Sequence, residues 1–86
     1  MEKRHLEKKK RVYVLATLDI PTQYLTYKDG YYGFVRDIEM ATKAANRATA
    51  NILKSDFYYG VNTDLELVIL PLEIRYELIE EINDNI

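Results

Sequence analysis

The sequence contains no cysteine and no tryptophan, and it has a single histidine, His5, and a single serine, Ser55. The absence of cysteine excludes disulfide bonds, zinc sites built on thiolates and a cysteine nucleophile. A serine nucleophile needs a base held in a fixed position, and the basic N-terminal segment around His5 offers none. One histidine is also too few for a typical transition-metal site. We therefore expect a protein that is not an enzyme and that uses neither a cofactor nor a metal ion.

Glycine and long apolar runs are scarce as well. The three glycines, Gly30, Gly33 and Gly60, do not have the spacing of a phosphate-binding loop. The apolar run at residues 12–18 is too short to span a bilayer, and no small-residue cleavage site follows it. These absences predict a soluble, cytoplasmic protein that does not associate with a membrane.

The length and the charge pattern indicate how the chain is organised. A chain of 86 residues with a net charge of −2 and 48% hydrophobic residues predicts one folded domain over residues 1–86. Within it we expect a basic, flexible arm at 1–10, a folded core at 11–80 and a tail at 83–86. Residues 1–11 carry six bases and residues 64–86 carry seven acids. These ends are either solvated or able to bind phosphate or a charged partner.

Four strands and one helix are predicted. Residues 11–19 read as a central strand because both of their faces are apolar. Asp29-Gly30 separates two runs rich in tyrosine and predicts a two-residue hairpin that pairs Lys28 with Tyr31. Its core face would carry Leu25, Tyr27, Tyr32 and Phe34.

The second half of the chain predicts a helix and then a strand. Asp37 is a good N-cap for a helix over 37–54, whose stripe of small apolar residues would face a sheet. Residues 64–70 form the last strand. For residues 71–82 the pattern favours a bent strand to about Tyr76 followed by a helical turn, and a helix that starts at Pro71 is the alternative. The expected fold is α+β: a mainly antiparallel four-stranded sheet in chain order strand-strand-strand-helix-strand, with the helix on one face. A right-handed crossover gives the spatial order third, second, first, fourth.

Tyrosine is the most abundant aromatic residue, with eight copies beside two phenylalanines. It serves either as ordinary sheet filler or as interface area with a polar tip. The outer face of the hairpin has no helix left to cover it, which indicates a partner or a second copy of the chain. The candidate partner-binding residues on this face are Tyr24, Lys28, Tyr31 and Val35.

A basic segment next to aromatic residues favours an alternative, because single-stranded nucleic acid is often held by cations and stacking rings. The isoelectric point near 5.3 opposes it, so nucleic acid is the less favoured partner. The candidate residues for this alternative are Lys8, Lys9, Lys10, Arg11, Lys43, Arg47 and Lys54.

The run Tyr27-Lys-Asp-Gly-Tyr-Tyr-Gly-Phe-Val-Arg-Asp-Ile-Glu-Met-Ala-Thr-Lys-Ala44, followed by an alanine-rich segment and a hydrophobic strand, resembles small accessory proteins of bacteriophages and prophages of low-GC Gram-positive bacteria. The resemblance covers residues 11–78 and assigns no role to individual residues. It implies a non-enzymatic protein-binding module that inhibits a host factor, such as a CRISPR-type defence nuclease, in the host cytoplasm. The alternative function is a small nucleic-acid-binding protein that uses the basic arm and exposed tyrosines.

Overall fold

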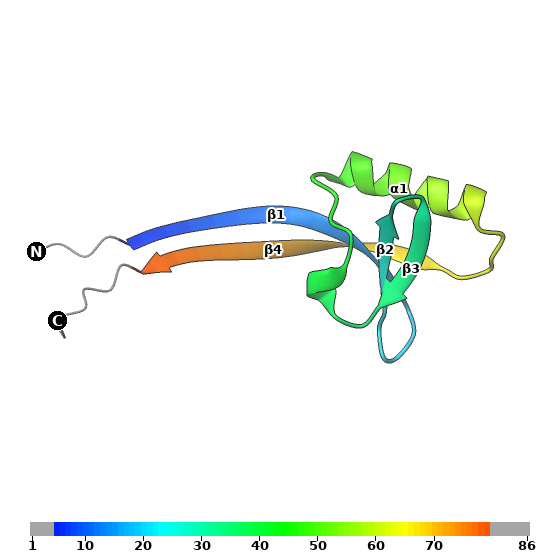
Figure 1. Ribbon diagram of the computed structural model, residues 1–86, viewed down its shortest axis with the longest axis horizontal. Coiled ribbons are helices and arrows are strands. Elements are labelled where there is room, and N and C mark those ends of the chain that lie inside the picture. The colour runs from blue at the N-terminus through cyan, green and yellow to red at the C-terminus, as the bar shows by residue number, and fades with distance from the viewer. Residues whose placement is uncertain (1–4, 80–86) are drawn as a thin grey trace, which may run out of the picture.

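The computed structural model describes residues 5–79 and confirms the α+β class. Four strands form one antiparallel sheet in the order β3-β2-β1-β4, as the sequence predicts (Figure 1). The elements are β1 (His5–Thr17), β2 (Tyr24–Lys28), β3 (Tyr31–Val35), the short 3-10 helix η1 (Ile38–Met40), α1 (Arg47–Gly60) and β4 (Leu67–Ile79).

The two longest strands, β1 and β4, pair without interruption from His5 opposite Ile79 to Thr17 opposite Leu67. Residues 5–10, which were expected to be a flexible arm, continue β1 as a regular strand paired with β4. The acidic C-terminal segment supplies the hydrogen-bonding partner that this basic segment lacks locally. Residues 1–4 and the predicted tail at 83–86 lie outside the described residues.

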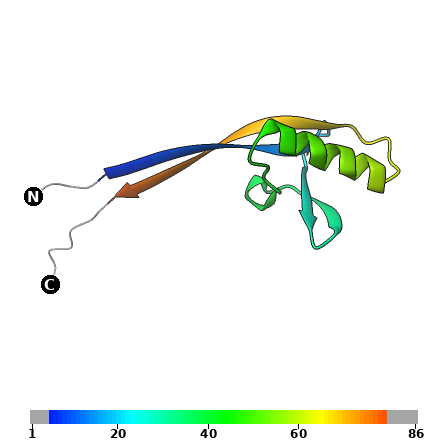
Figure 2. The same cartoon turned by 90° about the horizontal axis from the view of Figure 1, so that it is seen from above.

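The molecule has two regions. The head comprises residues 12–72, and the arm comprises residues 5–11 of β1 paired with residues 73–79 of β4. Figures 1 and 2 show the arm as a two-stranded ribbon that projects from the head, with its free end at the start of β1 and the end of β4. The radius of gyration is 17.8 Å, whereas a compact domain of this length has one of about 12 Å. The projecting arm explains the difference.

The hairpin has the predicted register, with Lys28 opposite Tyr31 and Leu25 opposite Phe34. Asp29 and Gly30 have φ values of 52° and 83°, as a two-residue turn between twisted strands requires. Leu25 is fully buried and Phe34 is half-buried on the predicted core face. Tyr27 lies closer to the turn and is more exposed than predicted, although its ring centroid is 4.7 Å from that of Tyr32.

The sheet opens between β1 and β2, which pair only where Ala16 faces Tyr24. Residues 41–44 fill this opening in an extended conformation. Ala44 exchanges both backbone hydrogen bonds with Tyr13, at 2.9 and 2.8 Å, and Thr42 donates its backbone N–H to the carbonyl of Leu25. Residues 41–44 thus satisfy the backbone N–H and carbonyl of Tyr13 in β1 and the carbonyl of Leu25 in β2, which the short pairing of these two strands leaves without a strand partner.

The predicted helix over 37–54 is wrong at both ends. Asp37 caps only η1, through a hydrogen bond from the Glu39 N–H, and α1 begins after Asn46, whose side chain accepts from the Thr49 N–H at 2.8 Å. The alanines before residue 46 have helical spacing, but the bonds to β1 and β2 hold them in the sheet opening. No helix within residues 5–79 is long and apolar enough to cross a membrane.

The core of the head lies between α1 and the sheet. The helix buries Ala50 and Phe57, two turns apart, and Phe57 packs in a core cluster with Leu15, Leu25 and Leu67. The ring centroid of Phe57 lies between 5.3 and 5.9 Å from those of three neighbouring rings, all in edge contacts. The three neighbours are Tyr32, Phe34 and Tyr58.

Pro71 lies in the middle of β4, and the sequence left open whether residues 71–82 continue as strand. They are strand up to Ile79, so the helical turn expected after Tyr76 is wrong for residues 77–79. Residues 80–82 lie outside the described part. Pro71 faces Tyr13, whose own N–H and carbonyl both bond Ala44 on the far side. Tyr13 and Pro71 therefore form a non-hydrogen-bonded pair. The backbone nitrogen of Pro71, which carries no hydrogen, faces the outer edge of the sheet, so the proline removes no hydrogen bond between β1 and β4.

Candidate functional site

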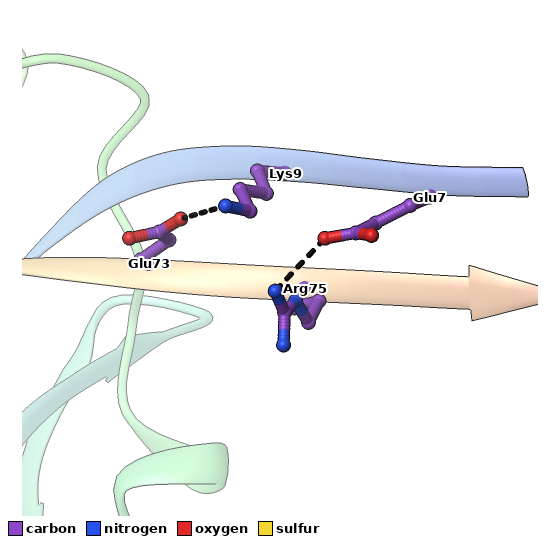
Figure 3. Close-up of polar contacts among 4 residues, drawn as sticks. All are labelled: Glu7, Lys9, Glu73 and Arg75. Atoms are coloured by element: carbon purple, nitrogen blue, oxygen red, sulfur yellow. Dashed lines mark ion pairs between the residues drawn. The ribbon is translucent and has the colours of Figure 1, made fainter.

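One face of the arm is charged. Alternation along the strands places Glu7, Lys9 and Arg11 on this face of β1, and Glu73, Arg75 and Glu77 beside them on β4. The Lys9 Nζ is 3.9 Å from a Glu73 oxygen, and the Arg75 Nη2 is 2.9 Å from Glu7 Oε1 (Figure 3). All four side chains are exposed, so each pair stabilises the arm by about 1 kcal/mol at most. Both ion pairs are diagonal, because Lys9 lies directly opposite Arg75 and Glu7 lies directly opposite Glu77.

The opposite face of β4 is apolar. Five alternate residues form what we name the apolar row, which starts in the head and continues to the end of the arm. Tyr76 and Leu78 are 53% and 56% exposed, and no described side chain at 7–11 or 73–78 is buried. The members of the row are Leu70, Leu72, Ile74, Tyr76 and Leu78.

The outer edge of β4 is the second feature of the arm. Because β4 is the last strand of the sheet, one side of its backbone has no partner strand among residues 5–79. The pairing of Tyr13 with Pro71 sets the alternation, so Glu73 and Arg75 also direct their N–H and carbonyl groups to this edge. An unpaired strand edge beside exposed apolar side chains is a template for another strand.

A hollow of about 390 Å³ lies where the arm leaves the head. Ile38, Glu39 and Lys43 line one side, and residues 72–75 of β4 line the other. Its apolar part is formed by Ile38 together with Leu72 and Ile74 of the apolar row. The apolar row and the unpaired edge therefore meet a concave surface at the base of the arm.

The predicted partner-binding residues share one face of the hairpin but do not form one patch. Lys28 and Tyr31 face each other next to the turn, and Tyr31 is 79% exposed. Tyr24 and Val35 face each other at the opposite end of the hairpin and are half-buried. The aromatic area available to a partner here is that of Tyr31.

The predicted nucleic-acid-binding residues are divided between separate places. Lys8 and Lys10 lie on the apolar side of the arm, and Lys9 and Arg11 lie on its charged side. Lys43 precedes α1, and its Nζ donates to the carbonyls of Glu39 and Ala41 at 2.7 and 3.1 Å.

The two remaining predicted cations lie on α1, seven residues apart. The Arg47 guanidinium lies 5.0 Å from the ring centroid of Tyr13, and Lys54 is half-buried. Lys43, which the predicted helix over 37–54 would contain, lies outside the helix.

No group of three or more His, Asp or Glu side chains within residues 5–79 is placed to hold a metal ion. Burial raises the pKa of Tyr32, and the nearby Tyr27 and Asp56 raise it further. The shift has a structural origin, because Tyr32 packs on Phe57.

No protein-family model matches the sequence, and comparison with curated proteins and with solved structures finds no match.

Proposed function

We propose that the protein is a non-enzymatic protein-binding module whose binding element is the arm. The observation that supports this most strongly is the apolar row, which continues past the folded core onto a ribbon where its side chains are exposed. Exposed apolar groups next to an unpaired strand edge favour association with another protein chain. No member of the row belongs to the core cluster of the head or packs against it, so folding alone does not account for the row.

The class of partner follows from the resemblance to phage accessory proteins. On this basis the module inhibits a host factor, such as a defence nuclease, by occupying a surface that the factor needs. Because side chains alternate along a strand, an exposed ribbon offers a partner two chemically different faces. Glu73 and Arg75 on one side, and Tyr76 and Leu78 on the other, provide such a pattern.

The test is affinity capture from a lysate of a low-GC Gram-positive host, followed by titration of the purified captured protein. A Tyr76→Lys/Leu78→Lys variant should lose at least tenfold in affinity, because two exposed apolar groups become charged. The matched control is Tyr59→Lys, which alters a tyrosine that is 96% exposed on α1, and it should bind as the wild type does. Loss of binding in Tyr24→Ala/Tyr31→Ala instead would assign the interface to the hairpin.

Nucleic-acid binding is the second candidate, because a two-stranded ribbon fits the major groove and the arm carries Lys8, Lys9, Lys10 and Arg11. Three carboxylates on the same ribbon, those of Glu7, Glu73 and Glu77, oppose it. Anisotropy titrations of single- and double-stranded oligonucleotides at increasing salt test this candidate. Tight binding with a steep salt dependence would favour nucleic acid over protein.

A further inference from the structure

We infer that the outer edge of β4 pairs with the same edge of a second copy, in an antiparallel register centred on Ile74. The inference deepens the proposed function and rests on it, because it names the first partner of the arm. It starts from three features of β4: the unpaired edge, the alternating charges and the apolar row. Each restricts how a second strand can be added.

The backbone restricts the register first. Odd-numbered residues of β4 direct their N–H and carbonyl groups outward, as the Tyr13–Pro71 pair establishes. In a two-fold antiparallel pair these residues must face odd-numbered residues of the second copy. The two-fold axis that relates the two strands then passes next to either an odd-numbered residue, such as Glu73 or Arg75, or an even-numbered residue, such as Ile74.

Charge selects among these centres. Centring on Arg75 places two Arg75 side chains against each other, and centring on Glu73 does the same for two carboxylates. Centring on Ile74 instead places Glu73 opposite Arg75 of the second copy, twice, and opposite charges across strands are stabilising. The alternation of charge along β4 is therefore self-complementary in this register.

The apolar row agrees with the same register. Ile74 faces its own copy, Leu72 faces Tyr76, and Leu70 faces Leu78, so each apolar side chain of one strand meets an apolar side chain of the other. Leu72 also lines the hollow at the base of the arm. The second copy's Tyr76 is thereby brought beside the apolar part of this hollow.

The edge of β1 is not equivalent. In the arm it carries Lys8, Lys9, Lys10 and Arg11 in succession, and lysines on an edge strand oppose pairing with a like edge. Association through β4 extends the two arms into one four-stranded ribbon and joins the two apolar rows. The joined rows form one apolar face for the partner of the proposed function.

The absence of cysteine from the chain makes a single-cysteine test direct. In the proposed register two Ile74→Cys residues face each other as a non-hydrogen-bonded pair, with Cα atoms about 4.5 Å apart, within disulfide range. Under mild oxidation the full-length Ile74→Cys protein should become a disulfide-linked dimer. Two copies of Leu72→Cys are displaced by four residues, about 13 Å, so Leu72→Cys alone and Tyr76→Cys alone should stay monomeric on a non-reducing gel.

An equal mixture of Leu72→Cys and Tyr76→Cys should cross-link, because these positions face each other between copies. Failure of Ile74→Cys to cross-link while its thiol reacts with a soluble reagent would overturn the inference. Equal cross-linking at all three positions would also overturn it, since that result indicates random collision. If Ile74→Cys stays monomeric but Tyr76→Lys/Leu78→Lys still abolishes partner capture, this inference falls and the proposed function stands.

Exchanging the charges at Glu73 and Arg75 tests the register independently, with sedimentation velocity as the measure of dimer formation. Glu73→Arg alone and Arg75→Glu alone each place like charges across the interface and should sediment as 10.1 kDa monomers at concentrations where the wild type is dimeric. Mixing the two variants restores both pairs and should restore a dimer. Each variant keeps its altered contacts to β1 in the mixture, so rescue reports on the interface between copies, and absence of rescue contradicts the register.

Discussion

The head and the arm share two strands, β1 and β4, but are held together differently. In the head, Leu15 and Leu67 of these strands pack under Phe57 and are almost fully buried. In the arm the same strands carry exposed side chains, and ladder hydrogen bonds and surface ion pairs hold them. An isolated two-stranded ribbon is only marginally stable in water. The residues of the head are therefore explained by folding, whereas we propose that the exposed apolar residues of the arm serve association.

The largest expected effect is in the head. Phe57→Ala removes a ring that is 2% exposed and contacts three other rings, so the free energy of unfolding should fall by about 3–5 kcal/mol. Tyr76→Ala in the arm is the matched aromatic truncation and should change it by less than about 0.5 kcal/mol. Urea unfolding followed by circular dichroism measures both. Equal losses would remove the distinction between the regions.

The hairpin turn should give the next largest effect. Gly30 has a φ of 83°, which a β-branched residue strongly disfavours, so Gly30→Val should lower the free energy of unfolding by about 1–3 kcal/mol. Gly60→Ala is the control, because its added Cβ would meet Tyr32 at an ordinary distance of 3.8 Å. An unchanged midpoint for Gly30→Val in thermal unfolding would be incompatible with the turn.

The ion pairs of the arm should matter less. Glu7→Gln removes the charge that faces Arg75 at 2.9 Å, and because both groups are exposed the free energy of unfolding should fall by less than about 1 kcal/mol. Unfolding at low and high salt checks this, since screening should bring variant and wild type together. A loss of several kcal/mol would indicate that the arm contributes to the stability of the head.

The smallest effect concerns pH. The pKa of Tyr32 is raised in the folded state, chiefly by burial, so its neutral form is favoured there. The resulting stability is present below the unfolded pKa of about 10 and is lost as pH rises through the folded pKa. Alkaline unfolding of Tyr32→Phe should therefore show a weaker dependence on pH than the wild type. An identical dependence would assign the alkaline transition to other groups.

The sequence predicts the parts of the fold that local rules determine. Asp29-Gly30 determines the hairpin register, and the apolar faces of β1 determine its central place in the sheet. It misplaces the helix, because the spacing of Ala41 and Ala44 suits a helix whereas hydrogen bonds to strands distant in the chain hold them extended. The Asn46 cap is the local signal that identifies the true start of α1.

The arm could be predicted only in part. The alternation of apolar and charged residues from Leu72 to Leu78 identifies a strand with one apolar face. The basic N-terminal segment and the acidic C-terminal segment are complementary, and this complementarity is the signal that they pair. It is insufficient alone, because the charges of residues 1–11 suit a solvated or nucleic-acid-binding segment equally well. The binding surface that we propose includes Tyr76 and Leu78. The sequence analysis overlooks both residues because it looks for exposed tyrosines on the hairpin.

The division of the molecule is tested most directly by thermal unfolding of a chain reduced to residues 11–73, since the arm contains the ends of both β1 and β4. The core cluster lies entirely within this segment. We predict a cooperative transition whose midpoint lies within about 8 °C of that of the full chain, equivalent to about 1 kcal/mol. A segment that is unfolded, or that melts without cooperativity, would contradict the claim that the head folds by itself and leaves the arm for binding.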